Sequence, residues 1–112
     1  MNHYIIWFNL KDNIKANSFS QDLINYLNAL KDRNLIIDYK IMRRKLGFGP
    51  SELGEFMVDL ICKDLGQLDK AFHTVIEGIS HNNDLEMLHK KVNTKVIDFK
   101  SALYRDFPDE NT

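Results

Sequence analysis

The residues best suited to acid–base chemistry are a histidine and two carboxylates that the sequence pattern can bring near a tryptophan. His3 and Trp7 fall in an apolar segment with strand-like alternation, which places both side chains on one face. A Lys-Asp pair recurs after a strand-like segment in each half of the chain, and aligning the two pairs puts Glu55 beside His3 and Asp59 beside Trp7. A His–Glu pair orients an imidazole, and a carboxylate against tryptophan loses water, which raises its pKa toward values useful for a base. We therefore predict His3, Glu55 and Asp59 as catalytic candidates.

The two carboxylates also have a structural interpretation. Glu55 and Asp59 can form salt bridges with Lys40 or Arg44 on a neighbouring strand, and such pairs are more common than catalytic ones. The candidate ligand-binding residues are aromatic, sulfur-containing or cationic: Trp7, Met42, Met57, Arg44 and Tyr104.

Other clusters point less clearly to a site. The basic run 43–45 precedes a glycine-containing loop and could hold an anion, but the Gly-Lys-Ser/Thr ending of a phosphate-binding loop is absent. A solvated edge strand followed by a hairpin-like loop is the better explanation of this run. His81, Asp84, Glu86 and His89 do not share one helix face, so we predict no metal site and no cofactor.

Hydrophobic periodicity predicts the elements that must position these residues. Alternation predicts strands over residues 3–10, 36–44, 55–62 and 100–107. Amphipathic spacing predicts a helix over 19–33 with a Ser18–Gln21 capping box, a second that starts after an Asp64 cap and ends at Gly78, and a third over 85–96.

This order is that of an α+β, ferredoxin-like β-α-β-β-α-β fold, with an antiparallel four-stranded sheet and one domain over residues 1–112. The first and third strands are the most apolar, so we expect them side by side at the centre and, from the split β-α-β arrangement, parallel. Phe8, Leu27, Leu60 and Phe72 are expected in the core between sheet and helices.

Two helices cover only one face of such a sheet. The opposite face would expose Ile5, Trp7, Met57 and Ile61, a larger apolar patch than monomers usually carry. We therefore predict a homodimer that buries this face. The alternative is that the third helix or a loop of the same chain covers it.

Composition restricts the class of protein. The chain has 112 residues, 15 basic and 16 acidic, and this balance disfavours a nucleic-acid partner. Cys62 is the only cysteine, which excludes an internal disulfide and fits a reducing compartment. No secretory signal and no apolar stretch of about 20 residues is visible, so we expect no membrane partner and a cytoplasmic location.

Both ends of the sequence resemble the dimeric α/β-barrel superfamily, in particular its stress-responsive A/B-barrel branch. The opening segment 3–12, HYIIWFNLKD, matches the branch's first strand, and the segments around His89 and 105–108 (RDFP) resemble its closing helix and strand. The first histidine of the branch's His-x-x-His motif is absent, and the second lies near His89. The middle segment 43–56 also resembles a small bacterial family of unknown function.

The resemblance implies a barrel-like cavity and a functional histidine near position 89. It makes His89 a further catalytic candidate, which we expect to approach the His3 site from the last helix. Relatives use such a cavity for cofactor-free oxygenation, cyclisation, haem-related chemistry or association alone, and the fold does not choose among them. The sequence thus supports two hypotheses. The first is a small-molecule-binding protein or cofactor-independent enzyme for an apolar or aromatic ligand. The second is a non-catalytic homodimeric association module, and an enclosed pocket would distinguish the two.

Overall fold

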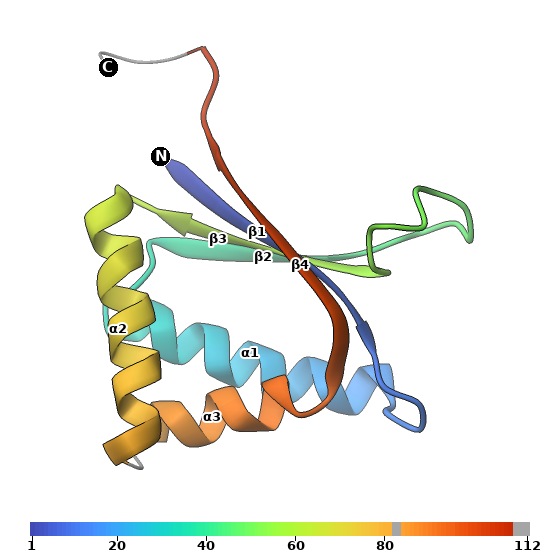
Figure 1. Ribbon diagram of the computed structural model, residues 1–112, viewed down its shortest axis with the longest axis horizontal. Coiled ribbons are helices and arrows are strands. Elements are labelled where there is room, and N and C mark those ends of the chain that lie inside the picture. Colours follow the sequence, from blue (N-terminus) through green and yellow to red (C-terminus); the bar gives the residue numbers. More distant parts are fainter. Residues whose placement is uncertain (82–83, 109–112) are drawn as a thin grey trace.

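A computed structural model describes the backbone of residues 1–81 and 84–108 and the side chains of residues 1–76 and 84–108. A four-stranded sheet lies against three helices (Figure 1). The elements in chain order are β1 (Asn2–Leu10), α1 (Ala16–Asp32), β2 (Asp38–Arg43), β3 (Phe56–Cys62), α2 (Leu65–His81), α3 (Asp84–Asn93) and β4 (Val96–Arg105). The predicted ferredoxin-like α+β fold is confirmed.

The sheet has the order β2-β3-β1-β4, and every neighbouring pair is antiparallel. The prediction that β1 and β3 run parallel is therefore wrong. Helix α1 crosses from β1 to β2, so these two strands point the same way and leave a space between them. The chain then reverses through the loop after β2, and β3 enters that space in the opposite direction.

The antiparallel pairing also overturns the predicted register. His3 lies opposite Ile61 and Trp7 opposite Met57, whereas Ile5 lies opposite Asp59. A parallel alignment of the two strands puts Glu55 beside His3 and Asp59 beside Trp7. Reversing the strand keeps the same residues on the same face but exchanges their neighbours.

Local hydrogen bonds explain where the helices begin. Helix α1 begins at Ala16 after Lys15, whose side chain makes no cap, so the predicted Ser18–Gln21 capping box is wrong and Ser18 lies inside the helix. For α2 the predicted cap is confirmed, since the backbone N–H of Gln67 donates to Asp64 Oδ1 at 2.8 Å. This helix continues past its predicted end at Gly78 to His81.

Strand β4 begins earlier than predicted because it pairs with the end of β1. The Lys11 amide donates to the Lys95 carbonyl at 2.9 Å, and Val96 lies opposite Leu10. Val96 therefore belongs to β4 rather than to the third helix. A bulge follows at Asp98, which has a φ of 58°. Asn9 stabilises the bulge by donating from Nδ2 to Asp98 Oδ2 at 3.1 Å.

Gly54 permits the loop before β3 to approach β1 closely. A Cβ atom at this position would lie 2.3 Å from the Phe8 carbonyl oxygen and 2.7 Å from the Phe8 nitrogen. These are backbone atoms that cannot move without disturbing the sheet. Glycine is therefore a steric requirement here.

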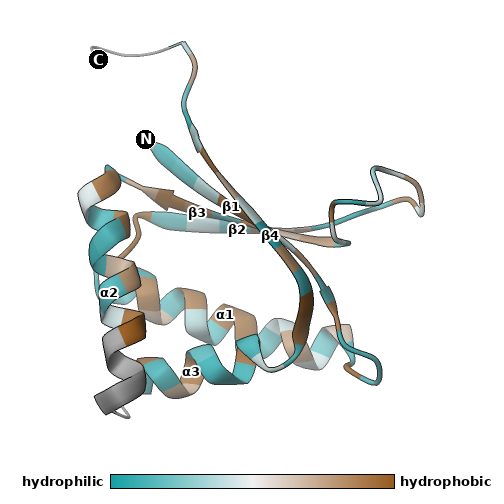
Figure 2. Cartoon of the chain, in the orientation of Figure 1, coloured by the Kyte–Doolittle hydropathy of each residue, from teal (hydrophilic) through white to brown (hydrophobic). Residues whose placement is uncertain are grey.

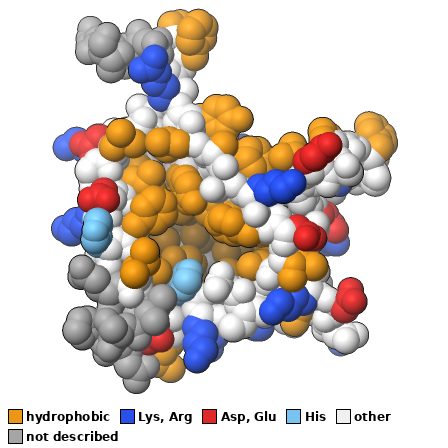
Figure 3. Space-filling view, in the orientation of Figure 1, with side chains coloured by type: hydrophobic (Ala, Val, Ile, Leu, Met, Phe, Trp, Pro, Cys, Tyr) orange, Lys and Arg blue, Asp and Glu red, His pale blue; other side chains and the backbone are white. Residues whose placement is uncertain are grey.

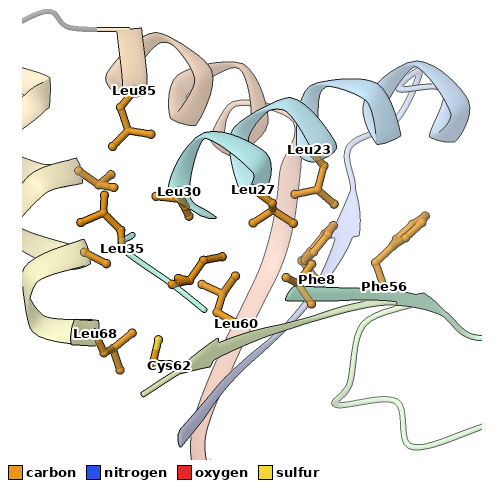
Figure 4. Packing of buried hydrophobic residues seen from close by; sticks show 14 of the residues in the cluster. Phe8, Leu23, Leu27, Leu30, Leu35, Phe56, Leu60, Cys62, Leu68 and Leu85 are labelled. Carbon is orange, nitrogen blue, oxygen red and sulfur yellow. The ribbon is translucent and has the colours of Figure 1, made fainter. Parts of the chain in front are cut away.

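The hydrophobic core lies between the sheet and the helices, where leucines of α1 meet phenylalanines and Leu60 of the sheet (Figure 4). Phe8, Leu27 and Leu60 are buried as predicted, and Cys62 is a core residue. Phe72 is 40% exposed, which corrects its assignment to the core. In Figure 2 the helices carry hydrophobic and hydrophilic residues along their length, as expected for amphipathic helices.

No described helix covers the other face of the sheet. We call this the outer sheet face, and it carries His3, Ile5 and Trp7 of β1 together with their partners on the other strands. It is built from rows of opposed residues. One row is Met42, Met57, Trp7 and Lys100, and another is Lys40, Asp59, Ile5 and Ala102.

Candidate functional site

His3 is held between two carboxylates on the outer sheet face. Its Nδ1 lies 2.9 Å from Asp59 Oδ2, and its Nε2 lies 2.6 Å from Asp106 Oδ1. Asp106 also contacts the N-terminal ammonium group of Met1 at 3.3 Å. Burial lowers the pKa of His3, but the hydrogen bonds to Asp59 and Asp106 outweigh it and raise that pKa above 6.5.

This arrangement favours a structural role for His3. Two carboxylates on the two ring nitrogens are best satisfied by an imidazolium, which has no lone pair with which to accept a proton. The same hydrogen bond from His3 lowers the pKa of Asp106. His3 and Asp59 share one face of the sheet as predicted, and they form a link between β1, β3 and the segment that follows β4.

Glu55 lies away from His3, contrary to prediction. Its carboxylate accepts from Arg43 Nε at 2.5 Å, and the Arg43 guanidinium lies 5.1 Å from the centre of the Phe56 ring. Arg44 donates from Nη2 to the Leu53 carbonyl at 2.8 Å, which stabilises the glycine-containing loop. Protein groups therefore occupy both arginines, and this weighs against an anion site at residues 43–45.

The other candidate ligand-binding residues do share the outer sheet face. Trp7, Met42 and Met57 form one cross-strand row, and Tyr104 lies opposite His3. Within the described residues, this row borders no cavity comparable to the cavity between the sheet and the helices. It is a surface suited to a partner rather than to a small molecule.

His89 lies on the opposite side of the sheet from His3 and Trp7, because α3 packs on the helical layer. The prediction that His89 approaches the His3 site is therefore wrong. The alternation predicts which side chains of a strand share a face of the sheet, but it does not predict which face the third helix covers.

A cavity of about 220 Å³ lies between the sheet and the helices, and His89 lines it. The floor consists of inward-facing residues of β1, β3 and β4, and the walls come from all three helices. Its main lining residues are apolar: Ile6, Phe8, Leu23, Leu27, Val58, Leu60, Phe72, Val75 and Phe99. Tyr4, Tyr26, His89 and Asn93 supply the polar side chains of the lining.

Tyr26 of α1 and His89 of α3 form the polar pair of this cavity. Their ring centres are 5.4 Å apart, with an angle of 56° between the rings. Burial raises the pKa of the Tyr26 hydroxyl above its usual value, and burial lowers the pKa of His89 although the charge of Glu86 partly opposes the shift. At neutral pH the pair is thus an un-ionised phenol beside a neutral imidazole.

Neither group is used by the described part of the protein. No described residue forms a hydrogen bond with the Tyr26 hydroxyl or with the His89 ring. Partly buried polar groups normally have hydrogen-bond partners, so the Tyr26 hydroxyl and the His89 ring are open to a further hydrogen bond on the wall of this cavity.

Sequence reasoning found His89 only through a resemblance and did not identify Tyr26. Tyr26 falls in the apolar row of α1, where a tyrosine looks like any other core residue. Its position seven residues after Phe19 places it in that row, and the spacing does not distinguish it from its apolar neighbours.

Two features are absent from the described residues. No group of three or more metal-ligating side chains gathers there, although the side chain of His81 lies outside the described residues. None of the described helices is long and apolar enough to cross a membrane.

Comparison with solved structures supports the fold. A protein of unknown function from Bacteroides fragilis NCTC 9343, described as dimeric and ferredoxin-like, aligns with a TM-score of 0.60 and 13% identity over 94% of this chain and 95% of its own. The protein At3g17210 from Arabidopsis thaliana aligns with a TM-score of 0.72 and 5% identity over 98% and 99%. At these identities the similarity concerns the fold alone.

Comparison with sequence families gives one match. No curated protein matches the chain. A family model matches residues 1–112 in full, and its family is described only as one of unknown function. The predicted resemblance to a family of unknown function is thus supported, while that to the stress-responsive A/B-barrel branch stays a prediction. The chain belongs to the Family of unknown function DUF6614.

Proposed function

We propose that this protein binds a small, largely apolar molecule in the cavity between sheet and helices. The observation that carries the proposal is the pair of unused polar groups, Tyr26 and His89, on the wall of an otherwise apolar cavity of about 220 Å³. Small-molecule sites typically combine an apolar lining with a few convergent polar groups.

The cavity has an opening through which such a molecule can enter. Figure 3 shows hydrophobic side chains gathered around a hollow between the sheet and the helices. Phe72 and Ile76 of α2 and Phe99 of β4 line the cavity and are also exposed. An apolar surface therefore continues from the outside into the cavity.

The same pair supplies the acid–base groups for a cofactor-independent reaction. A neutral His89 can accept a proton, and the un-ionised Tyr26 hydroxyl can donate a hydrogen bond to a developing negative charge. Binding is the primary proposal, and catalysis would use these two residues in place of His3, Glu55 and Asp59.

Ligand-detected NMR with a set of small aromatic fragments tests the proposal. We expect fragments that bind the wild-type protein to lose binding in an Ala71→Phe variant, which adds a ring to the buried cavity wall. A Trp7→Ala variant is the control, since it changes only the outer sheet face. Circular dichroism establishes that both variants fold, and Val75→Phe replaces Ala71→Phe if the latter does not. Absence of binding, or binding lost only in Trp7→Ala, would contradict the proposal.

We also propose that the outer sheet face pairs with a second copy of the chain. No described helix covers this face, and Ile5, Trp7, Met57 and Ile61 remain partly exposed on it. The Bacteroides fragilis protein of the same fold is described as dimeric. This association is also what the alternative function, a non-catalytic module, would require.

Light scattering tests the pairing. We expect a mass near twice 13.1 kDa for the wild-type protein and near one chain for Trp7→Lys, which places a charge in the middle of the row. Lys70→Glu, at an exposed position of α2 away from the outer sheet face, is a control that should remain dimeric. A single-chain mass for the wild type at micromolar concentration would refute the proposal.

A further inference from the structure

Among the described residues that line the cavity, no ionisable side chain is charged at neutral pH. These lining residues are apolar except Tyr4, Tyr26, His89 and Asn93, and none of them is Lys, Arg, Asp or Glu. An ion enters an apolar site favourably only with a countercharge or several hydrogen bonds. A carboxylate or an ammonium group on the ligand therefore has no partner there.

The two polar groups define the hydrogen bonds that the cavity offers. A neutral imidazole has one nitrogen that accepts and one that donates, and a phenol both donates and accepts. His89 is kept neutral because burial lowers its pKa, and Tyr26 keeps its proton because burial raises its pKa. A hydroxyl group on the ligand can donate to His89 and accept from Tyr26 at the same time.

The volume limits the rest of the molecule. An apolar cavity of about 150 Å³ in another protein holds one benzene molecule. A cavity of about 220 Å³ therefore has room for a single substituted ring. Tyr4 and Phe72 pack edge to face with ring centres 5.2 Å apart at the open side, and aromatic walls favour an aromatic ligand.

We infer that the cavity selects an uncharged, single-ring hydroxyaromatic compound, a simple phenol, whose hydroxyl group lies between Tyr26 and His89. This inference rests on the proposed function and specifies its ligand class. The ring lies among Leu27, Val75 and Phe99, and the para substituent points toward the opening beside Phe72.

Three compounds of matched shape test the inference by NMR titration at pH 7. 4-Methylphenol is neutral and carries the hydroxyl, 1,4-dimethylbenzene lacks it, and 4-methylbenzoate carries a charge. We expect 4-methylphenol to bind about tenfold more tightly than 1,4-dimethylbenzene, the effect of about one hydrogen bond. Binding of 4-methylbenzoate should be lost.

Variants assign this preference to the two residues. Tyr26→Phe and His89→Leu should each reduce the affinity for 4-methylphenol about fivefold to tenfold and leave that for 1,4-dimethylbenzene unchanged. Tyr39→Phe is the matched control, because its hydroxyl donates to Asn28 Oδ1 outside the cavity.

The outcomes separate the two proposals. Equal binding of all three compounds, or binding of 4-methylbenzoate alone, would overturn the ligand class while leaving a binding cavity. Binding of 1,4-dimethylbenzene as tight as that of 4-methylphenol would do the same. Failure of every compound to bind would overturn both proposals.

Discussion

Removing the Tyr26 hydroxyl should make the ligand-free protein more stable, which is opposite to the usual effect of a mutation. The hydroxyl has no hydrogen-bond partner among the described residues, and it is removed from much of the solvent on folding. Burying a hydroxyl without a partner costs about 1–3 kcal/mol. Because Tyr26 is only partly buried, we expect Tyr26→Phe to raise the free energy of unfolding by about 1 kcal/mol, at the low end of that range.

Urea unfolding followed by circular dichroism measures this effect. A change of about 1 kcal/mol moves the midpoint by about 0.5 M when the slope is about 2 kcal/mol/M. The protein is first refolded from denaturant, so that copurified small molecules do not stabilise the wild type. Tyr39→Phe is the control, and we expect it to lower stability by about 0.5–1 kcal/mol because it loses the 2.7 Å hydrogen bond to Asn28. If Tyr26→Phe destabilises the protein as Tyr39→Phe does, its hydroxyl has a partner and the reasoning about the cavity is refuted.

Three further predictions concern the fold. Because the pKa of His3 is raised in the folded protein, the stabilisation that protonated His3 gives is complete below about pH 6.5 and is lost as the pH rises through the folded-state pKa. The urea midpoint of the wild type should therefore fall over that pH range, and the midpoint of Asp106→Asn should change less. Equal changes of the midpoint with pH in the two proteins would contradict the hydrogen bonds of His3 to its carboxylates. Leu27→Ala should lower the free energy of unfolding by about 2–5 kcal/mol. Phe72→Ala should lower it much less, because the Phe72 side chain is 40% exposed. Equal decreases in the two variants, measured by thermal unfolding, would show that Phe72 is a core residue. Gly54→Ala should destabilise the protein strongly, because its Cβ would overlap the backbone of β1; an unchanged melting temperature would be incompatible with this close approach.

The order and faces of the elements could be predicted from the sequence because they depend on local periodicity. Alternation placed Ile5 and Trp7 on one face and Phe8 on the other, and amphipathic spacing found Leu27 on the buried side of α1. The direction of β3 could not be read this way. It depends on how α1 and the loop after β2 route the chain, and the apparent repeat of Lys-Asp pairs led to a parallel register.

The candidate site was predicted only in part for a related reason. Alternation predicts that His3 and Asp59 lie on the same face of the sheet. It does not predict Asp106, which completes their cluster and lies 103 positions after His3 in the chain. The cavity requires knowledge of which helix faces pack against each other. Tyr26 and His89 are 63 positions apart on different helices, and no spacing rule joins them.

The most direct measurement is an NMR spectrum of nuclear Overhauser effects between bound 4-methylphenol and the isotopically labelled protein. We expect contacts from the ligand ring to the methyl groups of Leu27 and Val75 and to the His89 ring, all of which line the cavity. Contacts to Trp7 or Met57 on the outer sheet face, or no contacts from a ligand shown to bind, would contradict the assignment of the cavity as the functional site.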